Sequence, residues 1–161
     1  MDLTKITFRH AKHTNEDFFE LRSIHKEAMF DSVVETIGEW NDEFQKSRLE
    51  KHFKEAYSTL LFIEYEGKTI GTINQRLKVY EDGEFQFIEQ FYLKKSYQGK
   101  GIGSYIFELK LNKDEETRLS VLKKDVKTHQ FYFKNGFIEY KEDEYQKYMK
   151  KPSLSKKPKI K

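Results

Sequence analysis

The chain reads Gln98-Gly99-Lys100-Gly101-Ile102-Gly103 between two contrasting segments. The apolar run from Phe85 to Leu93 before it is typical of a strand, and the run from Ile102 to Leu111 has helical spacing. Glycines at a strand-to-helix junction let backbone N–H groups approach a ligand without interference from Cβ atoms. The helix dipole favours negative charge at the same place. We therefore predict a phosphate-binding loop at residues 98–103.

The common nucleotide-binding loops fit this stretch poorly. The loop of nucleotide hydrolases needs Ser or Thr after Gly-Lys, but Gly101 follows Lys100 here. A dinucleotide fingerprint needs G-x-G-x-x-G inside a β-α-β unit, whereas these glycines are spaced G-x-G-x-G after a meander. A kinase-type loop needs a longer chain with the loop near its start. A plain tight turn before a helix is the alternative without a ligand.

The chain has 161 residues, a formal net charge of +3 and no cysteine. This length suits one domain, and the balance of charges gives no reason to expect a nucleic-acid partner. The lack of cysteine excludes disulfides and a thiol nucleophile, and no His, Asp and Glu cluster has metal-ligand spacing, so we expect no metal. Without a signal peptide or an apolar run of roughly 20 residues, we expect a cytoplasmic protein that does not bind membranes.

Apolar spacing predicts the element order β-α-α-β-β-β-α-β-α-β-β. The antiparallel meander in the middle argues against a doubly wound sheet, so we expect an α/β (α+β) fold with a mixed sheet and helices on both faces. We expect one domain over residues 1–150 and a basic, disordered tail at residues 151–161. The expected strands are Ile6–His10, Leu60–Tyr65, Thr69–Lys78, Phe85–Leu93, Leu119–Leu122, Phe137–Tyr140 and Tyr145–Met149, and the expected helices begin near Glu16, Asp42, Ile102 and Val126.

Local signals refine these elements. Asn15 is predicted to be the N-cap of the first helix. Phe44, Leu49 and Phe53 are predicted to mark the buried side of the second helix. The pair Asp82-Gly83 is predicted to form the centre of a hairpin turn in which both residues have positive φ.

A second segment, Phe131-Tyr132-Phe133-Lys134-Asn135-Gly136-Phe137, lies about thirty residues after the glycine-rich stretch. With residues 98–103, it resembles the GCN5-related N-acetyltransferase (GNAT) superfamily. There, Q/R-x-x-G-x-G/A follows the fourth strand, and a helix ending in F-Y-x-x-x-G-F follows the fifth. The resemblance covers about Ile6 to Lys150. It implies a mostly antiparallel sheet of about seven strands that splays between strands 4 and 5.

The resemblance implies acetyl-CoA as co-substrate. The loop amides would bind its pyrophosphate, and the end of the fourth strand would pair with its pantetheine arm. Asp125 stands where the family usually has Asn, and a carboxylate can accept a hydrogen bond there but cannot donate one. The implied cofactor-binding residues are Phe91, Leu93, Gln98, Gly99, Lys100, Gly101, Ile102, Gly103, Ser104, Asp125 and Tyr132.

The resemblance also implies direct attack of a primary amine on the thioester in a ternary complex, with Tyr132 protonating the leaving thiolate. The alternative for Tyr132 is a packing role beside Phe131. Glu89 is the candidate base, because simple alternation places it on one strand face with Phe87 and Phe91, and apolar surroundings raise a carboxylate's pKa. A bulge would change this facing. The alternative for Glu89 is a cross-strand salt bridge with Arg76.

The acceptor is less defined than the cofactor. The resemblance implies that the region from Glu39 and Trp40 to Arg48 and Phe53 forms one wall of the acceptor site. The acidic residues near Trp40 favour a cationic acceptor. The acceptor is a small-molecule amine in one interpretation, and a protein lysine or N-terminus in another. A non-catalytic acyl-CoA-binding module is a third possibility, and the chain is expected to be a monomer or a homodimer. The acidic residues are Glu35, Glu39, Asp42 and Glu43.

Overall fold

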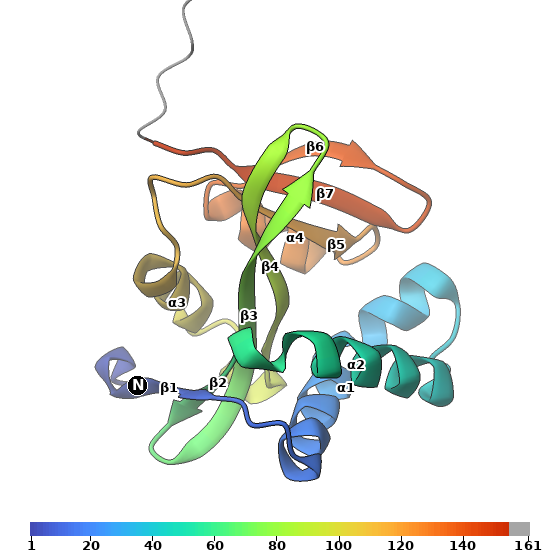
Figure 1. Cartoon of the computed structure of the whole chain (residues 1–161), viewed down its shortest axis with the longest axis vertical. Helices are drawn as coiled ribbons and strands as arrows, with labels where there is room; N and C mark the ends of the chain where they lie inside the picture. Colours follow the sequence, from blue (N-terminus) through green and yellow to red (C-terminus); the bar gives the residue numbers. More distant parts are fainter. Residues whose placement is uncertain (155–161) are drawn as a thin grey trace, which may run out of the picture.

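The computed structural model describes residues 1–154, which fold around one mixed sheet of seven strands (Figure 1). The strand order is β1-β2-β3-β4-β5-β7-β6, in which β4 and β5 pair in parallel and the other neighbours pair antiparallel. The predicted fold class is therefore confirmed. The strands are β1 (Ile6–His10), β2 (Leu60–Tyr65), β3 (Lys68–Tyr80), β4 (Gly83–Leu93), β5 (Thr117–Leu122), β6 (Ile138–Glu142) and β7 (Gln146–Lys151).

Four α-helices cover the two faces of the sheet within residues 1–154. Phe62 on β2 packs in a core with α1 and α2, whereas its neighbour Ile63 packs in a second core with α3 and α4. This division follows from the alternation of side chains along a strand. The helices are α1 (Asn15–Ile37), α2 (Asp42–Ala56), α3 (Ile102–Lys110) and α4 (Val126–Lys134).

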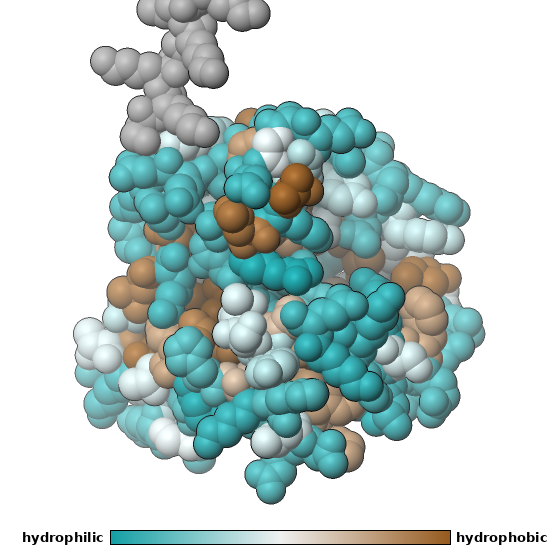
Figure 2. Space-filling model, viewed as in Figure 1, coloured by the Kyte–Doolittle hydropathy of each residue, from teal (hydrophilic) through white to brown (hydrophobic). Residues whose placement is uncertain are grey.

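The exposed surface is mostly hydrophilic on the face shown in Figure 2. Hydrophobic surface stands out near the β3–β4 hairpin, where Leu77 and Val79 are exposed. No helix within residues 1–154 is long and apolar enough to cross a membrane.

The cap of α1 differs from the prediction. Thr14 is the N-cap, since its hydroxyl accepts a hydrogen bond from the backbone N–H of Asp17 at 3.2 Å, and Asn15 is the first helical residue. Thr14 can cap the helix because its extended backbone directs Oγ1 at the N–H groups of the first turn, which have no partner within the helix. The helix ends at Gly38, whose φ of 103° needs glycine.

The buried side of α2 also differs in part. Leu49 and Phe53 are buried as predicted, but Phe44 is 56% exposed. The buried stripe begins instead at Gln45, because residues 45, 49, 53 and 56 follow the helical spacing of four, four and three. Phe44 lies one position off this stripe.

The predicted hairpin forms, but its turn is different. Tyr80 pairs with Gly83, so Glu81 and Asp82 are the two turn residues, and Gly83 is the residue with positive φ, at 136°. The Asp82 carboxylate accepts hydrogen bonds from Arg118 at 3.1 and 2.6 Å. This contact holds the turn against the start of β5.

The C-terminal boundary lies later than predicted. Lys151 is part of β7, and the backbone N–H of Leu154 donates to the carbonyl of Lys113 at 2.9 Å. The remainder of the predicted disordered tail, residues 155–161, lies outside the described residues.

Candidate active site

The sheet opens between β4 and β5. These strands pair only at Gln86–Thr117 and Phe87–Arg118, after which they diverge toward their carboxyl ends. Arg118 is 3% exposed and its guanidinium lies 3.8 Å from the centre of the Phe85 ring, so it fixes the closed end of the pair. The predicted splay between the fourth and fifth strands is confirmed.

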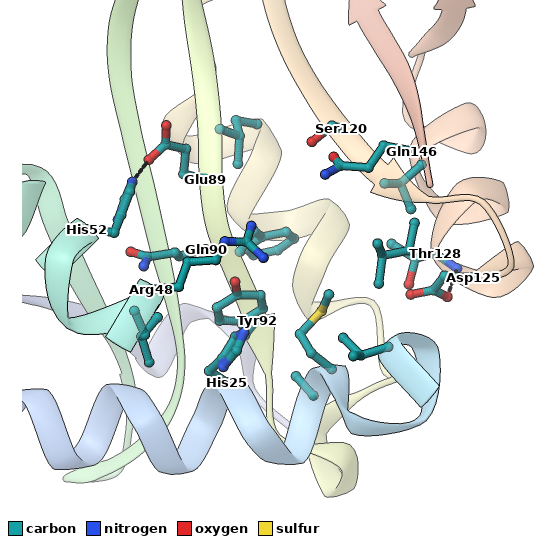
Figure 3. A pocket seen from close by; sticks show the side chains of 18 of the residues that line it. His25, Arg48, His52, Glu89, Gln90, Tyr92, Ser120, Asp125, Thr128 and Gln146 are labelled. Atoms are coloured by element: carbon teal, nitrogen blue, oxygen red, sulfur yellow. Dashed lines mark hydrogen bonds and ion pairs between the residues drawn. The ribbon is translucent and has the colours of Figure 1, made fainter. Parts of the chain in front are cut away.

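A cavity of about 860 Å³ lies at this opening. Its wall is built from α1, α2, β3, β4, β5 and the start of α4, and this volume is typical of small-molecule sites. Figure 3 shows Glu89 and His52 on one side of the cavity and Asp125 and Thr128 on the other. The cavity therefore brings together segments that are far apart in the sequence.

A bulge in β4 directs the side chains at this opening. Gln90 has a φ of 51°, and the pairing of β3 with β4 shifts at this point. As a result, Phe91 packs on Phe107 of α3, whereas Glu89 turns toward α2. The predicted common face of Glu89 and Phe91 is wrong, because the bulge adds one residue to the alternation.

The glycine loop presents a row of unpaired amides. Gly99 and Gly101 have φ values of 73° and 80°, which side chains with Cβ atoms rarely adopt. Within residues 1–154, no backbone carbonyl accepts a hydrogen bond from the N–H groups of residues 99–104. These donors gather at the N-terminus of α3, where an anion is favoured.

Gly103 has a different role from the other two glycines. A Cβ atom there would lie 2.7 Å from the ring of Phe131. Gly103 thus allows α3 to pack closely against α4. Gly103→Ala would therefore disturb the packing of α3 against α4 rather than the geometry of the loop.

The remaining cofactor candidates line the cavity or the loop. Phe91, Leu93, Gln98 and Asp125 lie in the cavity wall. The Gln98 amide donates to the Leu93 carbonyl at 2.8 Å, which joins the loop to the end of β4. The ammonium of Lys100 lies over the Tyr97 ring at 5.9 Å.

Asp125 has a structural partner for each carboxylate oxygen. Oδ1 accepts from the backbone N–H of Thr128 at 3.1 Å and caps α4, and Oδ2 accepts from the Ser32 hydroxyl at 2.8 Å. The acidic residue therefore links α1 to α4 across the cavity. An N-cap is a favourable place for a carboxylate, which accounts for Asp at this position.

Tyr132 lies in the cavity wall and is 7% exposed. Its ring stacks on Phe107 with a centroid separation of 6.1 Å and meets Phe137 edge-on at 5.7 Å. Burial raises the pKa of the Tyr132 hydroxyl well above its ordinary value. The hydroxyl is therefore protonated at neutral pH and can serve as a proton donor.

Glu89 is surrounded by basic side chains. It is hydrogen-bonded to His52, and its other oxygen lies 3.1 Å from Arg76 Nη2 and 3.4 Å from Lys78 Nζ. Burial would raise the pKa of Glu89, but the hydrogen bond with His52 and the charge of Arg76 together lower it to about 2. The predicted rise in its pKa is wrong, because basic groups rather than apolar ones face it.

This lowered pKa predicts a pH-dependent stability. The Glu89 contribution, at most about 3 kcal/mol for a shift from 4.5 to about 2, is present above about pH 4.5 and is lost as pH falls toward 2. Glu89→Gln should therefore destabilise the protein most above pH 4.5, with a difference that shrinks in acid. Urea unfolding of both proteins across this range measures it. Glu66→Gln removes an exposed ion pair as a control, and a pH-independent difference for Glu89→Gln would contradict the expectation.

Sequence reasoning gave no role to His52 or Tyr92, which line the cavity, whereas Arg48 belongs to the segment expected in the acceptor wall. Arg48 and His52 follow Phe44 on α2 at intervals of four, so they form the helix face beside the buried stripe. This spacing was the available signal for a second functional face. Nothing in the sequence indicated that His52 contacts Glu89, since that contact joins residues 37 positions apart.

Glu39 and Trp40 lie outside the cavity wall. The Trp40 ring packs on His25 at 5.4 Å and on Phe30 at 5.6 Å, and its Nε1–H donates to Asp42 at 3.1 Å. His25 does line the cavity. Trp40 therefore supports the wall from behind, and Glu39 is exposed between the helices.

Comparisons with known proteins agree with this geometry. Residues 56–139 match the family described as "Acetyltransferase (GNAT) domain". This match spans β2 to β6 and includes both motif segments. A search among curated proteins found no match.

Solved structures share the fold over nearly the whole chain. PH1933 of Pyrococcus horikoshii is 22% identical, with a TM-score of 0.68 and coverage of 91% of this chain and 97% of that one. The PaiA N-acetyltransferase of Thermoplasma acidophilum, solved with coenzyme A, is 23% identical, with a TM-score of 0.61 and coverage of 91% and 98%. Naa50 of Arabidopsis thaliana, solved with the bisubstrate analogue CoA-Ac-MVNAL, is 19% identical, with a TM-score of 0.62 and coverage of 92% and 99%.

Proposed function

Because this chain belongs to the GNAT acetyltransferase family, we propose that it transfers an acetyl group from acetyl-CoA to a primary amine by direct attack in a ternary complex. One observation carries the proposal. A single cavity joins Tyr132 and the start of α4 on one side to Glu89 and His52 on the other. The amine and the thioester can therefore meet between a proton donor and a basic pair.

We assign the two ends of acetyl-CoA to the splay and to the glycine loop. Beyond Phe87, β4 loses its pairing with β5, so an extended, amide-containing arm can pair with its edge beside Phe91 and Leu93. The unpaired N–H groups of residues 99–104 suit the pyrophosphate, and Lys100 adds positive charge beside them. Gln98 and Asp125 hold the loop and α4 in place.

We assign the acid role to Tyr132. As the amine nitrogen forms its bond to the thioester carbon, the carbon–sulfur bond breaks and the Tyr132 hydroxyl gives its proton to the departing sulfur. Burial raises the pKa of the Tyr132 phenol, but the same burial also disfavours the departing thiolate, so the proton transfer to sulfur remains feasible. The protonated, buried hydroxyl in the cavity wall supports this role.

We assign the base role to His52 and Glu89 together. With its low pKa, Glu89 alone is a weak base, and its oxygens are engaged by three side chains. His52 Nε2 faces Glu89, whereas Nδ1 has no hydrogen-bond partner within residues 1–154. We propose that Glu89 orients His52 and that the two side chains take the amine proton as one unit.

The test of the cofactor assignment is thermal stabilisation by acetyl-CoA. At a concentration one hundred times Kd, binding should stabilise the protein by about 2.7 kcal/mol and raise Tm. Gly101→Ala should reduce this gain, because the substitution strains the loop at φ 80°. Calorimetry or thermal-shift fluorescence measures both.

A matched control separates strain from ligand binding. Gly38→Ala introduces a Cβ at another left-handed glycine with free space around it, at the end of α1. This variant should lose stability but keep the full gain from acetyl-CoA. An unstabilised wild type would overturn the cofactor assignment, and binding without turnover of any amine would favour a non-catalytic acyl-CoA-binding module.

A further inference from the structure

The acceptor side of the cavity, formed by α2, β3 and β4, is rich in positive charge. Four permanent cations line it, against two carboxylates, Glu55 and Glu89. His25 adds no charge at neutral pH, because burial and the nearby Arg48 lower its pKa to about 4. The acidic residues near Trp40 do not offset this excess, since none of them lines the cavity. The four cations are Arg48, Lys51, Arg76 and Lys78.

These cations divide into two groups by their partners. Arg76 and Lys78 lie within 3.4 Å of Glu89, and Lys78 also lies 4.1 Å from the centre of the Phe87 ring. Both cations therefore have a carboxylate partner, although they share a single one. Arg48 and Lys51 form no ion pair with any carboxylate in the described part of the chain, and Arg48 lies near His25 and Tyr92.

Arg48 is also directed at the ligand space. In Figure 3 its side chain extends from α2 into the cavity, beside Gln90 and Tyr92. Arg48 follows Phe44 by one helical repeat and precedes His52 by another, so it shares their face of α2. A guanidinium in this position offers several N–H donors in a fixed plane, which suits a carboxylate or a phosphate.

We propose that the acceptor is a primary amine that also carries an anionic group, and that Arg48 binds this group while the amine lies near His52. The inference rests on the proposed function, since it names the acceptor of that reaction. It reverses the expectation of a purely cationic acceptor. Arg48 is exposed and has no carboxylate partner, so an anionic group on the acceptor would supply one, whereas an amine without an anion would not.

The test compares amines that differ only in the anion. One pair is L-leucine and L-leucinamide, chosen because Met29, Val33 and Phe44 give the cavity an apolar wall. The other pair is phosphoethanolamine and ethanolamine, which distinguishes phosphate from carboxylate recognition. CoA release is measured for wild type, Arg48→Gln and Arg48→Glu. Lys46→Gln, which removes a positive charge from α2 outside the cavity wall, is the control.

Arg48→Gln should lower kcat/KM for the anionic member of the preferred pair by about tenfold to a hundredfold, mainly through KM. The kcat/KM for the neutral member should not change. Each amine is compared with itself across the variants, so differences in basicity between amines cancel. Arg48→Glu should reverse the preference within the pair, and Lys46→Gln should change nothing.

The inference is overturned if wild type acetylates only neutral or cationic amines, or if it acetylates neither pair. It is also overturned if Arg48→Gln lowers kcat/KM equally for the anionic and the neutral amine of a pair. Each of these results leaves stabilisation by acetyl-CoA intact, so the proposed cofactor site stands. Loss of that stabilisation in wild type is a separate result, which overturns the proposed function and the inference with it.

Discussion

Tyr132→Phe should lower kcat by about 10²–10⁴, the usual contribution of a positioned acid. The substitution removes only the hydroxyl, so the stacked ring keeps its contacts with Phe107 and Phe137. Acetyl-CoA affinity should therefore change little. Steady-state kinetics with the best amine, together with acetyl-CoA titration, separate the two effects.

Tyr105→Phe is the matched control for this variant. Tyr105 is a partly buried tyrosine on α3 that packs against the same core but does not line the cavity. Its substitution should leave kcat within about twofold, as expected for a site without a role in the reaction. A Tyr132→Phe enzyme with unchanged kcat would assign Tyr132 to packing alone.

His52→Gln and Glu89→Gln should each lower kcat/KM by about 10²–10³, because the two residues act as one proton-accepting unit. The double variant should be hardly worse than either single variant, since removing one member already disables the pair. The rising limb of the pH–rate profile should flatten in both single variants. The measurement is a double-mutant cycle: steady-state kinetics across the pH range for wild type, both single variants and the double variant.

The comparison needs a control for the loss of a strand carboxylate. Glu64→Gln removes a carboxylate on β2 that pairs with Arg9 at 3.7 Å and lies outside the cavity. It should leave the pH–rate profile unchanged. Additive losses in the double variant would separate His52 from Glu89, and a normal rising limb in His52→Gln would exclude His52 as the base.

The sequence was informative wherever a local pattern has one structural solution. The apolar run Leu60–Tyr65 predicted β2 to the residue, and the glycines at 99 and 101 do adopt left-handed conformations. Predictions were wrong where a local pattern is compatible with more than one structure. Thr14 rather than Asn15 caps α1, since both can accept the same hydrogen bonds, and Gln45 rather than Phe44 begins the buried stripe of α2.

The candidate site shows the same division. Most of the residues that we assign to acetyl-CoA could be proposed from the sequence, because they belong to two short motifs, residues 98–103 and 131–137. The acceptor side could not, because its contacts join separate elements. The bulge at Gln90 places Glu89 and Phe91 on opposite faces, and Glu89 contacts His52 of α2. The cross-strand salt bridge with Arg76, the alternative for Glu89, does form.

The sequence by itself determined the order of the elements and the glycine loop, because backbone preference and apolar spacing are local properties. The tertiary structure decided the ionisation of Glu89, the orientation of Arg48 and the wall that Trp40 supports. Charge and burial depend on neighbours that are distant along the chain. From the sequence alone, the Glu89 carboxylate could be a base in apolar surroundings or an anion held in ion pairs. In this fold, β3 and α2 bring the cations to it.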